Sequence, residues 1–588
     1  MIKINFGAFT RTLERIENTS SQNEMVAILS GLFKDIEPEE IDKACYMVLG
    51  RIAPPYESIV LGLSEKTVQS AISLAGGIPK DEVEEKIRNL GDIGEVAVKM
   101  VKNMENPFKD YFDYTGELSV KDIFDGLRKI AYTFGKGSQE IKKKILASML
   151  IEADEVGRKY IARLAEGTMR IGVGDMTILN ALSVAFFGSK QKKAELEHAY
   201  NVSSDIGLVA RVLKNKGIKG INEIKITINR PIKVMLAQRV SKFEDIRNKI
   251  KSRDISAEEK FDGERIQAHK DGKSVKLYSR RSTDVTSQFP DLVENIKRYV
   301  NVEKAILDGE AMAYDFENDI FASFQILMQR RRKYDVKEYR KKIPVRYMVF
   351  DVLYVDGKSF MHTGYPERRN KLETLIEGSK YIALANRRVS SDMNSIDDFF
   401  QECLNKNLEG IVCKSCAEDS YYQAGGRDWT WIKWKKEYIG KLSDTLDLVI
   451  LGAYAGRGRR SGTYGALLCA AYNHTEDTFE TVCKVGTGFS DKQLADMPEK
   501  LADAGVYKMP ARATVTKEME PDFWFTPKYV VEVLGSEITK SPVHTCNWEE
   551  GKKQGLALRF PRFIRWREEK SPEQATTTEE ILQMYKWI

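Results

Sequence analysis

The sequence predicts a multidomain protein with an all-α N-terminal domain, an α+β middle domain and a C-terminal domain built as a small β-barrel. The chain has 588 residues, enough for about three or four domains of ordinary size. Apolar residues recur at helical spacing up to about residue 218, and short strand-like runs between Gly and Asp turns follow them. From about residue 440 onward, β-type runs dominate. We therefore expect domains at 1–218, 219–438 and 439–588.

Composition excludes several classes of protein. The chain is 42% hydrophobic and 30% charged, as expected for a globular protein in solution. No apolar run approaches the length of a membrane span, and the first residues lack the basic-then-apolar pattern of a signal peptide. The 7 cysteines are irregularly spaced, which favours a reducing compartment over a disulfide framework. We expect a cytoplasmic monomer that binds no membrane.

Basic residues form clusters along the whole chain, although the net charge is only +6. A single cluster of this kind is usually a solvated face. Several clusters spread over the length fit a long polyanion better than a small ligand. The clusters are Lys142–Lys144, Arg330–Lys333, Arg340–Lys342, and Arg457 with Arg459 and Arg460.

The N-terminal region contains a clear helical pattern after Ser138, which is placed to cap it. The lysines at 142–144 are expected on its outer face. The residues expected on its inner face are Ile141, Ile145, Met149 and Leu150.

A second helix is expected from about Asp154 to Ala165, ending near Gly167. The segment Gly167–Gly174 then combines three glycines with Arg170, which would let the backbone approach a phosphate closely. Taken alone, it fits a loop between packed helices equally well.

The middle region carries a segment, Glu258–Arg265, in which a lysine flanked by carboxylates precedes an Asp-Gly pair. Such a pair turns a chain sharply because glycine accepts positive φ, so Lys260 is expected at the end of a short strand. An ammonium held there among other cations loses basicity, and its neutral amine can attack a phosphoryl group. Taken alone, the segment is more often a surface hairpin with a solvated lysine.

Four further stretches supply groups suited to a nucleotide. Strand alternation places Asp308 and Glu310 on one face, where two carboxylates need a cation or a sugar hydroxyl between them. Phe350 lies in an apolar strand, either as a core residue or as a flat partner for a purine. Lys433 and Lys435 share one strand face and need an anion such as a triphosphate. The stretches are Ile306–Ala311, Val349–Leu353, Leu408–Lys414 and Trp431–Lys435.

The C-terminal region contains β-rich runs of the length found in small five-stranded barrels, many of which bind oligonucleotides. The runs are Leu446–Tyr454, Tyr464–Tyr472, Thr481–Val485 and Tyr529–Leu534.

The motifs of the middle region occur in the order found in one family. They are Lys-x-Asp-Gly-x-Arg from Lys260, Ser279-Arg280, Asp308-Gly-Glu310, Phe350-Asp351, Glu409–Lys414 and Trp431–Lys435. This series is similar to the nucleotidyltransferase motifs of the ATP-dependent DNA ligases, members of the covalent nucleotidyltransferase superfamily.

The resemblance spans essentially the whole chain. Lys484–Phe489 and Leu558–Arg565 look like the ligase barrel-domain motifs, and Arg567–Lys570 looks like the closing motif. Gly167–Val173 resembles the helical DNA-binding domain of the archaeal and eukaryotic replicative ligases. Two positions depart from the family pattern, Glu569 where Asp is usual and Val234 where a second proline is common.

The resemblance implies an all-α DNA-binding domain, an α+β nucleotidyltransferase (adenylation) domain and a C-terminal OB-fold barrel. It implies that ATP, with Mg²⁺, adenylylates Lys260. AMP would then pass to the 5′-phosphate of nicked duplex DNA, and the neighbouring 3′-hydroxyl would seal the strand. A replication sliding clamp is a further candidate partner.

The resemblance also implies a role for each site residue. Glu258 would accept a hydrogen bond from the adenine amino group, and Phe350 would stack on the base. Arg265 and Glu310 would hold the ribose, while Glu409 and Glu310 are the expected metal carboxylates. The residues expected to reach phosphate are Arg280, Arg427, Lys433 and Lys435, with Arg567 and Lys570 orienting the departing pyrophosphate. Because the barrel domain must close on ATP and later turn toward DNA, we expect a flexible joint near Lys436–Lys441.

Two alternatives remain at this point. An RNA ligase or mRNA capping enzyme would keep the nucleotidyl motifs, but it would not need the long helical region. A non-catalytic DNA-binding clamp would not need the intact set of Lys260, Glu310 and Lys433. A ligase using NAD⁺ typically adds a four-cysteine zinc module, whereas Cys413-x-x-Cys416 has no second pair at zinc spacing.

Overall fold

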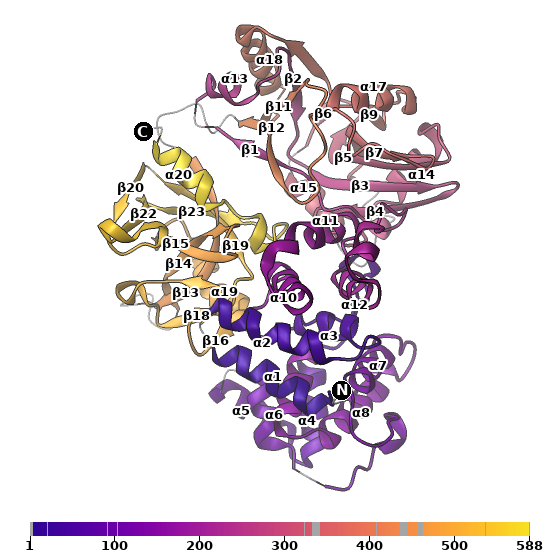
Figure 1. Cartoon of the computed structure of the whole chain (residues 1–588), viewed down its shortest axis with the longest axis vertical. Helices are drawn as coiled ribbons and strands as arrows, with labels where there is room; N and C mark the ends of the chain where they lie inside the picture. Colours follow the sequence, from indigo (N-terminus) through magenta and orange to yellow (C-terminus); the bar gives the residue numbers. More distant parts are fainter. Residues whose placement is uncertain are drawn as a thin grey trace.

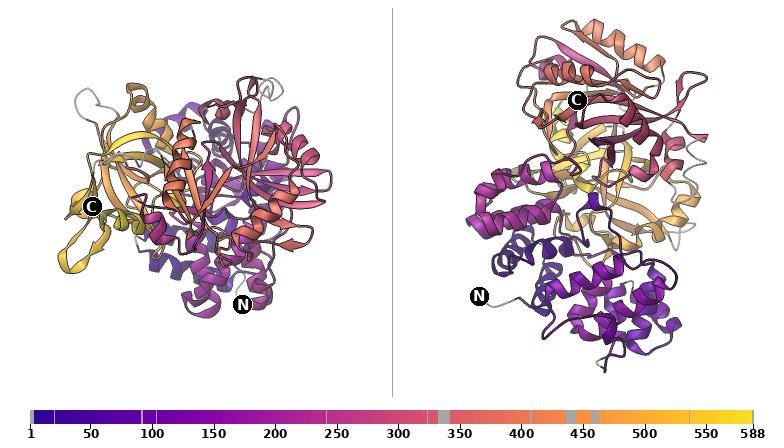
Figure 2. Two further views of the ribbon diagram at one scale, coloured as in Figure 1. Left: turned by 90° about the horizontal axis from the view of Figure 1, so that it is seen from above. Right: turned by 90° about the vertical axis from the view of Figure 1, so that its right-hand side faces the viewer.

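The fold is taken from a computed structural model of the chain. It describes residues 4–19, 21–90, 92–102, 104–240, 242–322, 324–331, 342–406, 408–435, 444–456, 463–535 and 537–586. The helical region lies at one end of the molecule, and the middle and C-terminal domains lie beside each other at the other end (Figure 1). The view from above shows the same arrangement, with the helices beneath both strand-rich domains (Figure 2).

The N-terminal region is helical, as predicted, and its helices share one hydrophobic core. The helices are α1 (Phe6–Asn18), α2 (Gln22–Asp35), α3 (Ile41–Val48), α4 (Glu65–Gly76), α5 (Lys80–Leu90), α6 (Ile93–Met100), α7 (Val120–Ala131), α8 (Ser138–Glu152), α9 (Glu155–Glu166), α10 (Asp175–Phe187), α11 (Lys193–Ser203) and α12 (Ile206–Asn222).

The second predicted helix is confirmed as α9. Its N-cap Asp154 accepts a hydrogen bond from the amide of Gly157, and it ends at Gly167, whose φ of 85° is the left-handed conformation that favours glycine. The predicted cap of α8 was wrong, and its predicted faces were right only in part, since Ile145, Met149 and Leu150 are buried as expected. Gly137 occupies the cap position, Ile141 is 41% exposed, and Lys142 is buried. Lys142 faces inward because its amine donates to the carbonyl of Leu61 at 2.7 Å.

The middle region contains two sheets. One sheet has the strand order β1-β12-β11-β2-β10; the other has the order β4-β3-β5-β7-β8, with β6 beside β5 and β9 beside β7. Its strands are β1 (Leu236–Arg239), β2 (Ile255–Lys260), β3 (Glu264–Asp271), β4 (Ser274–Ser279), β5 (Lys304–Asp315), β6 (Ile320–Phe321), β7 (Val345–Val355), β8 (Lys358–Ser359), β9 (Ile382–Leu384), β10 (Arg387–Ser390), β11 (Gly410–Ser415) and β12 (Arg427–Lys435). Its helices are α13 (Asp245–Lys249), α14 (Pro290–Tyr299), α15 (Phe324–Met328), α17 (Tyr365–Leu375) and α18 (Met393–Asn405).

The C-terminal region is strand-rich, and all four predicted runs fall on strands. Its described strands form an eight-stranded sheet and a three-stranded sheet that pack on one core. The elements are β13 (Asp444–Ala455), β14 (Tyr464–Asn473), β15 (Thr478–Val485), α19 (Asp491–Leu501), β16 (Gly505–Val506), β17 (Ala513–Thr514), β18 (Phe523–Phe525), β19 (Val530–Gly535), β20 (Glu537–Ser541), β21 (Cys546–Glu549), β22 (Gln554–Arg559), β23 (Arg562–Trp566) and α20 (Thr578–Lys586).

Polar contacts join the three regions. Thr177 of α10 donates to the buried carboxylate of Asp477 in the C-terminal domain at 2.8 Å. The amide of Lys233 donates to the carbonyl of Asn201 in α11 at 2.7 Å, and Arg427 of β12 pairs with Glu580 of α20 at 3.0 Å. Across the described residues, none of the helices is long and apolar enough to cross a membrane. The expected joint at Lys436–Lys441 and the basic residues at 457–460 lie outside the described residues.

Candidate active site

A cavity of about 470 Å³ lies between the two sheets of the middle domain and is completed by the C-terminal domain. Every residue to which the family resemblance assigned a role lines this cavity. From the middle domain these are Glu258, Lys260, Arg265, Arg280, Glu310, Phe350, Glu409, Arg427, Lys433 and Lys435. From the C-terminal domain they are Arg567 and Lys570. The structure therefore brings together residues that are far apart in the sequence, but it does not test the role of each one.

Lys260 ends β2, directly before the Asp-Gly pair, as predicted. The reason offered for the glycine was wrong, because Gly263 is not among the residues with positive φ. Its missing side chain is needed for space instead. A Cβ at this position would lie 2.4 Å from the carbonyl oxygen of Ala311 and 2.4 Å from the sulfur of Met312. The glycine thus lets the Lys260 turn lie directly against β5.

The amine of Lys260 is ion-paired with Glu409, a contact that the expectation of an ammonium held among other cations did not include. Lys435 pairs with the other oxygen of the same carboxylate. Burial alone would raise the pKa of Glu409, but the ammonium groups of Lys260 and Lys435 outweigh burial and hold this pKa below its usual range. Glu409 precedes β11, so its place beside Lys260 follows from the pairing of β11 with β2.

Two more carboxylates lie close to the lysine. Burial, assisted by Glu409 and Asp262, raises the pKa of Glu310 to about 7 against the opposing charges of Lys260 and Arg265. Burial and then Glu409 also raise the pKa of Asp262. This crowding of carboxylates fits Mg²⁺, which binds proteins through one or two carboxylates together with substrate phosphates. Glu310 and Glu409 are the residues suited to hold it.

One part of the cavity is formed by aromatic rings around a buried carboxylate. The Phe350 and Trp431 rings lie 6.3 Å apart at 77°. Lys414 lies 4.2 Å from the centre of the Trp431 ring and pairs with Glu258 at 2.6 Å. Glu258 is therefore held beside the rings, where a base edge can reach it.

Arg265 lies 5.3 Å from the centre of the Phe350 ring and is fixed by a buried carboxylate. Its guanidinium donates to both oxygens of Asp308, at 3.0 and 2.7 Å, and to the carbonyl of Met235 at 2.8 Å. Tyr422 donates to the same carboxylate at 2.7 Å. Asp308 is fully buried and does not line the cavity, so only Glu310 of the two predicted carboxylates reaches it.

Cations gather at the opposite end of the cavity. Strand alternation on β12 places Lys433 and Lys435 in the cavity and packs Ile432 and Trp434 in the core, as predicted. Burial, together with Lys435, Arg427 and Arg239 and against Glu580, lowers the pKa of Lys433 to about 7. Desolvated cations of this kind need an anion, which a triphosphate supplies.

Arg280 also lines the cavity and is another desolvated cation. Burial and then the charges of Arg265 and Arg567 lower its pKa to about 10. Its buried Nε has no hydrogen-bond partner among the described residues. Arg427, also expected to reach phosphate, is instead paired with Glu580 in this structure.

The C-terminal domain brings its own charges to the cavity. Asp447 of β13 pairs with Lys570 and lies 3.3 Å from Arg567, which also pairs with Glu532 at 2.8 Å. Burial would raise the pKa of Asp447, but Lys570 and Arg567 hold it well below its usual range. Arg281 of the middle domain donates to the carbonyl of Lys570. These contacts close the cavity over its cationic end.

Three more residues of the cavity lining were missed in the sequence. Lys414, Trp431 and Asp447 line the cavity without having been assigned a role. Lys414 and Trp431 stand inside quoted motifs, and the same alternation that selected their neighbours could have selected them. No sequence pattern marked Asp447 as a cavity residue, because its partner Lys570 lies more than a hundred residues away in the sequence.

A strand-end lysine set between a base-sized aromatic site and a cluster of cations defines an enzyme of the covalent nucleotidyltransferase class. Most of the chain matches domains of one family: "DNA ligase N terminus" over residues 5–183, "ATP dependent DNA ligase domain" over 234–435 and "ATP dependent DNA ligase C terminal region" over 460–570. The chain belongs to the ATP-dependent DNA ligases.

Relatives of similar length support this assignment. The chain is 44% identical to DNA ligase 2 of Thermofilum pendens, over 97% of this chain and 96% of the relative. It is 41% identical to DNA ligase 1 of Methanosarcina mazei, over 98% of both chains.

Among solved structures, Pmar-Lig_Pre is similar at 16% identity and a TM-score of 0.44, over 95% of this chain and 99% of that one. A mycobacterial DNA ligase D complexed with ATP and MES is similar at 25% identity and a TM-score of 0.33, over 58% and 97%.

Proposed function

We propose that this ATP-dependent DNA ligase seals nicks in duplex DNA by way of an AMP group carried on Lys260. The observation that carries the proposal is the 470 Å³ cavity, which Lys260 lines together with Glu258 and with the cations Lys433 and Lys435. ATP bound along the cavity would place its base at Glu258 and Phe350 and its phosphates among Lys433, Lys435 and Arg280. The amine would then face the α-phosphorus.

In phosphoryl transfer, an enzyme contributes mainly by positioning the reacting groups and by neutralising the charge on the phosphate. Lys433 and Lys435 would neutralise the α-phosphate, and Arg567 and Lys570 would orient the pyrophosphate that leaves. Arg265, fixed by Asp308, would hold the ribose together with Glu310. Mg²⁺ held by Glu310 and Glu409 would supply further neutralisation of the phosphate oxygens.

The amine of Lys260 forms a nitrogen–phosphorus bond to AMP as the bond to pyrophosphate breaks. The 5′-phosphate of the nick then takes AMP from the lysine. The 3′-hydroxyl attacks that phosphate, the phosphodiester bond forms, and AMP leaves. Each step is a phosphoryl transfer, so the same cations serve all three.

Finer features of the chain are also proposals. We propose that the C-terminal strands close as an OB-fold barrel, which fits the packing of both sheets on one core. The domain bounds 1–218, 219–438 and 439–588 fit the end of α12 at Asn222 and the start of β13 at Asp444. Action as a cytoplasmic monomer and contact with a sliding clamp remain predictions.

The test uses labelled nucleotides and a matched lysine variant. Incubation with α-labelled ATP, but not with α-labelled GTP or labelled NAD⁺, should leave acid-labile label on the protein, and nicked duplex should remove it. Lys260→Ala should lose labelling yet still seal a nick whose 5′-phosphate already carries AMP. Lys273→Ala, which changes an exposed lysine after β3, should keep both activities. Nick sealing from ATP by Lys260→Ala at the parent's rate would refute the proposal.

A further inference from the structure

The carboxylate of Glu258 is held by three donors, two of which come from one helix. The phenol of Tyr365 donates to its Oε1, and Arg369 contacts the same oxygen at 3.3 Å. Lys414 pairs with Oε2 at 2.6 Å. Tyr365 and Arg369 are four residues apart on α17, so they lie on one face of that helix.

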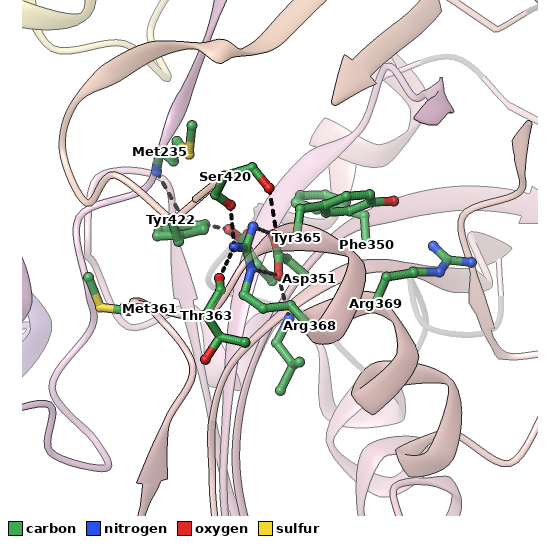
Figure 3. A network of polar contacts seen from close by, with 12 residues as sticks. Met235, Phe350, Asp351, Met361, Thr363, Tyr365, Arg368, Arg369, Ser420 and Tyr422 are labelled. Carbon is green, nitrogen blue, oxygen red and sulfur yellow. Dashed lines mark hydrogen bonds and ion pairs between the residues drawn. The ribbon is translucent and has the colours of Figure 1, made fainter. Parts of the chain in front are cut away.

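The helix is itself anchored close to the base site. Arg368 of α17 donates to both oxygens of Asp351, at 2.8 and 3.0 Å, and to the carbonyls of Thr363 and Ser420 at 2.7 and 2.8 Å. Asp351 directly follows Phe350 on β7. Figure 3 shows Arg368 directed at Asp351, while Tyr365 and Arg369 project from the same helix. A buried arginine thus fixes α17 relative to the strand that carries the base-stacking ring.

The number of acceptor sites on Glu258 decides how many hydrogen bonds this carboxylate can still accept from a ligand. A carboxylate has about four lone-pair sites, two on each oxygen. Tyr365 and Arg369 occupy those of Oε1, and Lys414 occupies one on Oε2. Counting donors from the described part of the chain, one acceptor site therefore remains, on Oε2, and Glu258 lines the cavity.

We propose that Tyr365 and Arg369 are positioning residues that fix Glu258 as an acceptor for the 6-amino group of adenine and so set the preference for ATP. The inference rests on the proposed role of Glu258. A 6-oxo purine such as guanine presents an acceptor to the same site, and two acceptors repel. With Oε1 fully engaged, the carboxylate cannot turn to avoid that repulsion.

Both donors are suited to this task. Burial and then the charge of Glu258 raise the pKa of Tyr365 well above its ordinary value, so its phenol stays protonated and donates. Arg369 also donates to the carbonyl of Ala385 at 2.9 Å and pairs with Glu373 at 2.9 Å. Its guanidinium is therefore held on three sides.

The experiment compares ATP with purine riboside triphosphate, which lacks the 6-amino group. The measured quantity is the ratio of kcat/KM for self-adenylylation by the two nucleotides. A hydrogen bond to a charged acceptor predicts a ratio of roughly 10 to 150 for the parent. Tyr365→Phe and Arg369→Met should each lower it at least about threefold, and Arg369→Lys should restore part of the loss.

A matched control separates positioning from general destabilisation. Tyr160→Phe removes another buried phenol that donates to a carboxylate, Glu17, at 2.7 Å, but it does so in the helical domain. It should leave the nucleotide ratio unchanged even where it lowers the melting temperature. A purely structural role for Tyr365 would behave in the same way and would overturn the inference.

Glu258→Ala distinguishes the two levels of the proposal. In one outcome, the ratio of kcat/KM for ATP to that for purine riboside triphosphate falls in Glu258→Ala but keeps the parent's value in Tyr365→Phe and Arg369→Met. This outcome would refute the positioning role and leave the role of Glu258 intact. A parent ratio kept in Glu258→Ala would refute the role of Glu258 itself, and the inference would fall with it.

Discussion

The raised pKa of Glu310 predicts that the active site holds a carboxylate at a cost in stability. The folded protein has a pKa of about 7 for this group, against an ordinary value of 4.5, chiefly because the group is buried. A raised carboxyl pKa means that the folded state binds more protons than the unfolded state between these two values. Stability is therefore lost as the pH rises from about 4.5 to about 7.

The magnitude follows from the two pKa values. A difference of about 2.5 units, 7 minus 4.5, corresponds to about 3 kcal/mol at pH 8, and linkage leaves less than about 1 kcal/mol at pH 5. Glu310→Gln removes the charge while keeping the shape. We expect this variant to lose self-adenylylation and yet to exceed the parent in unfolding free energy by up to about 3 kcal/mol at pH 8.

The assay is calorimetric or denaturant-induced unfolding of parent and variant from pH 5 to pH 8, without nucleotide or divalent cation. Glu294→Gln is the control, because the Glu294 side chain is 63% exposed on α14 and its replacement should change stability by less than about 0.5 kcal/mol. An advantage of Glu310→Gln that does not grow between pH 5 and pH 8 would refute the reasoning.

Three further predictions concern other parts of the site. Gly263→Ala should destabilise the protein by about 1–3 kcal/mol in denaturant unfolding and should slow self-adenylylation, because the added Cβ would lie 2.4 Å from the Ala311 carbonyl oxygen. A parent-like stability together with a parent-like rate of self-adenylylation would contradict the close approach. Burial is the main reason why the pKa of Lys433 is lowered to about 7, so the amine is charged below that pH and neutral above it. KM for ATP should therefore rise between pH 6 and pH 8.5 in the parent and stay level in Lys433→Arg. Equal pH profiles of KM in the two proteins would contradict this prediction. Phe560 is 74% exposed, lies between Arg559 and Arg562 in the sequence and should contact DNA. Phe560→Ala should therefore slow sealing of a nick that already carries AMP while leaving self-adenylylation at the parent's rate. An equal loss of both activities would count against a DNA contact.

Local patterns predicted most of what the site contains. The alternation of Lys433 and Lys435 with Ile432 and Trp434 depends only on strand geometry, and the structure has it. The order of the motifs placed Lys260 and Glu310 in one cavity. Such features are readable because a strand or a helix fixes its side-chain directions within a few residues.

What could not be predicted depends on long-range packing. Lys142 looked like a surface lysine, yet a carbonyl from the segment before α4 draws its amine inward. The role of Gly263 depends on the distance to β5, which no spacing encodes. The pairing of Lys260 with Glu409 and of Asp447 with Lys570 joins residues that meet only in the folded chain.

The cationic end of the cavity is shared between two domains, and this has a consequence for the direction of the reaction. Arg567, Lys570 and Asp447 all belong to the C-terminal domain, whereas Glu258, Phe350 and Lys260 belong to the middle domain. Any outward swing of the C-terminal domain would therefore carry off the groups proposed to orient pyrophosphate and would leave the adenylate where it was formed. Once that swing has happened, pyrophosphate would find no organised site from which to reclaim AMP, and the activated enzyme could wait for a broken strand without discharging backward.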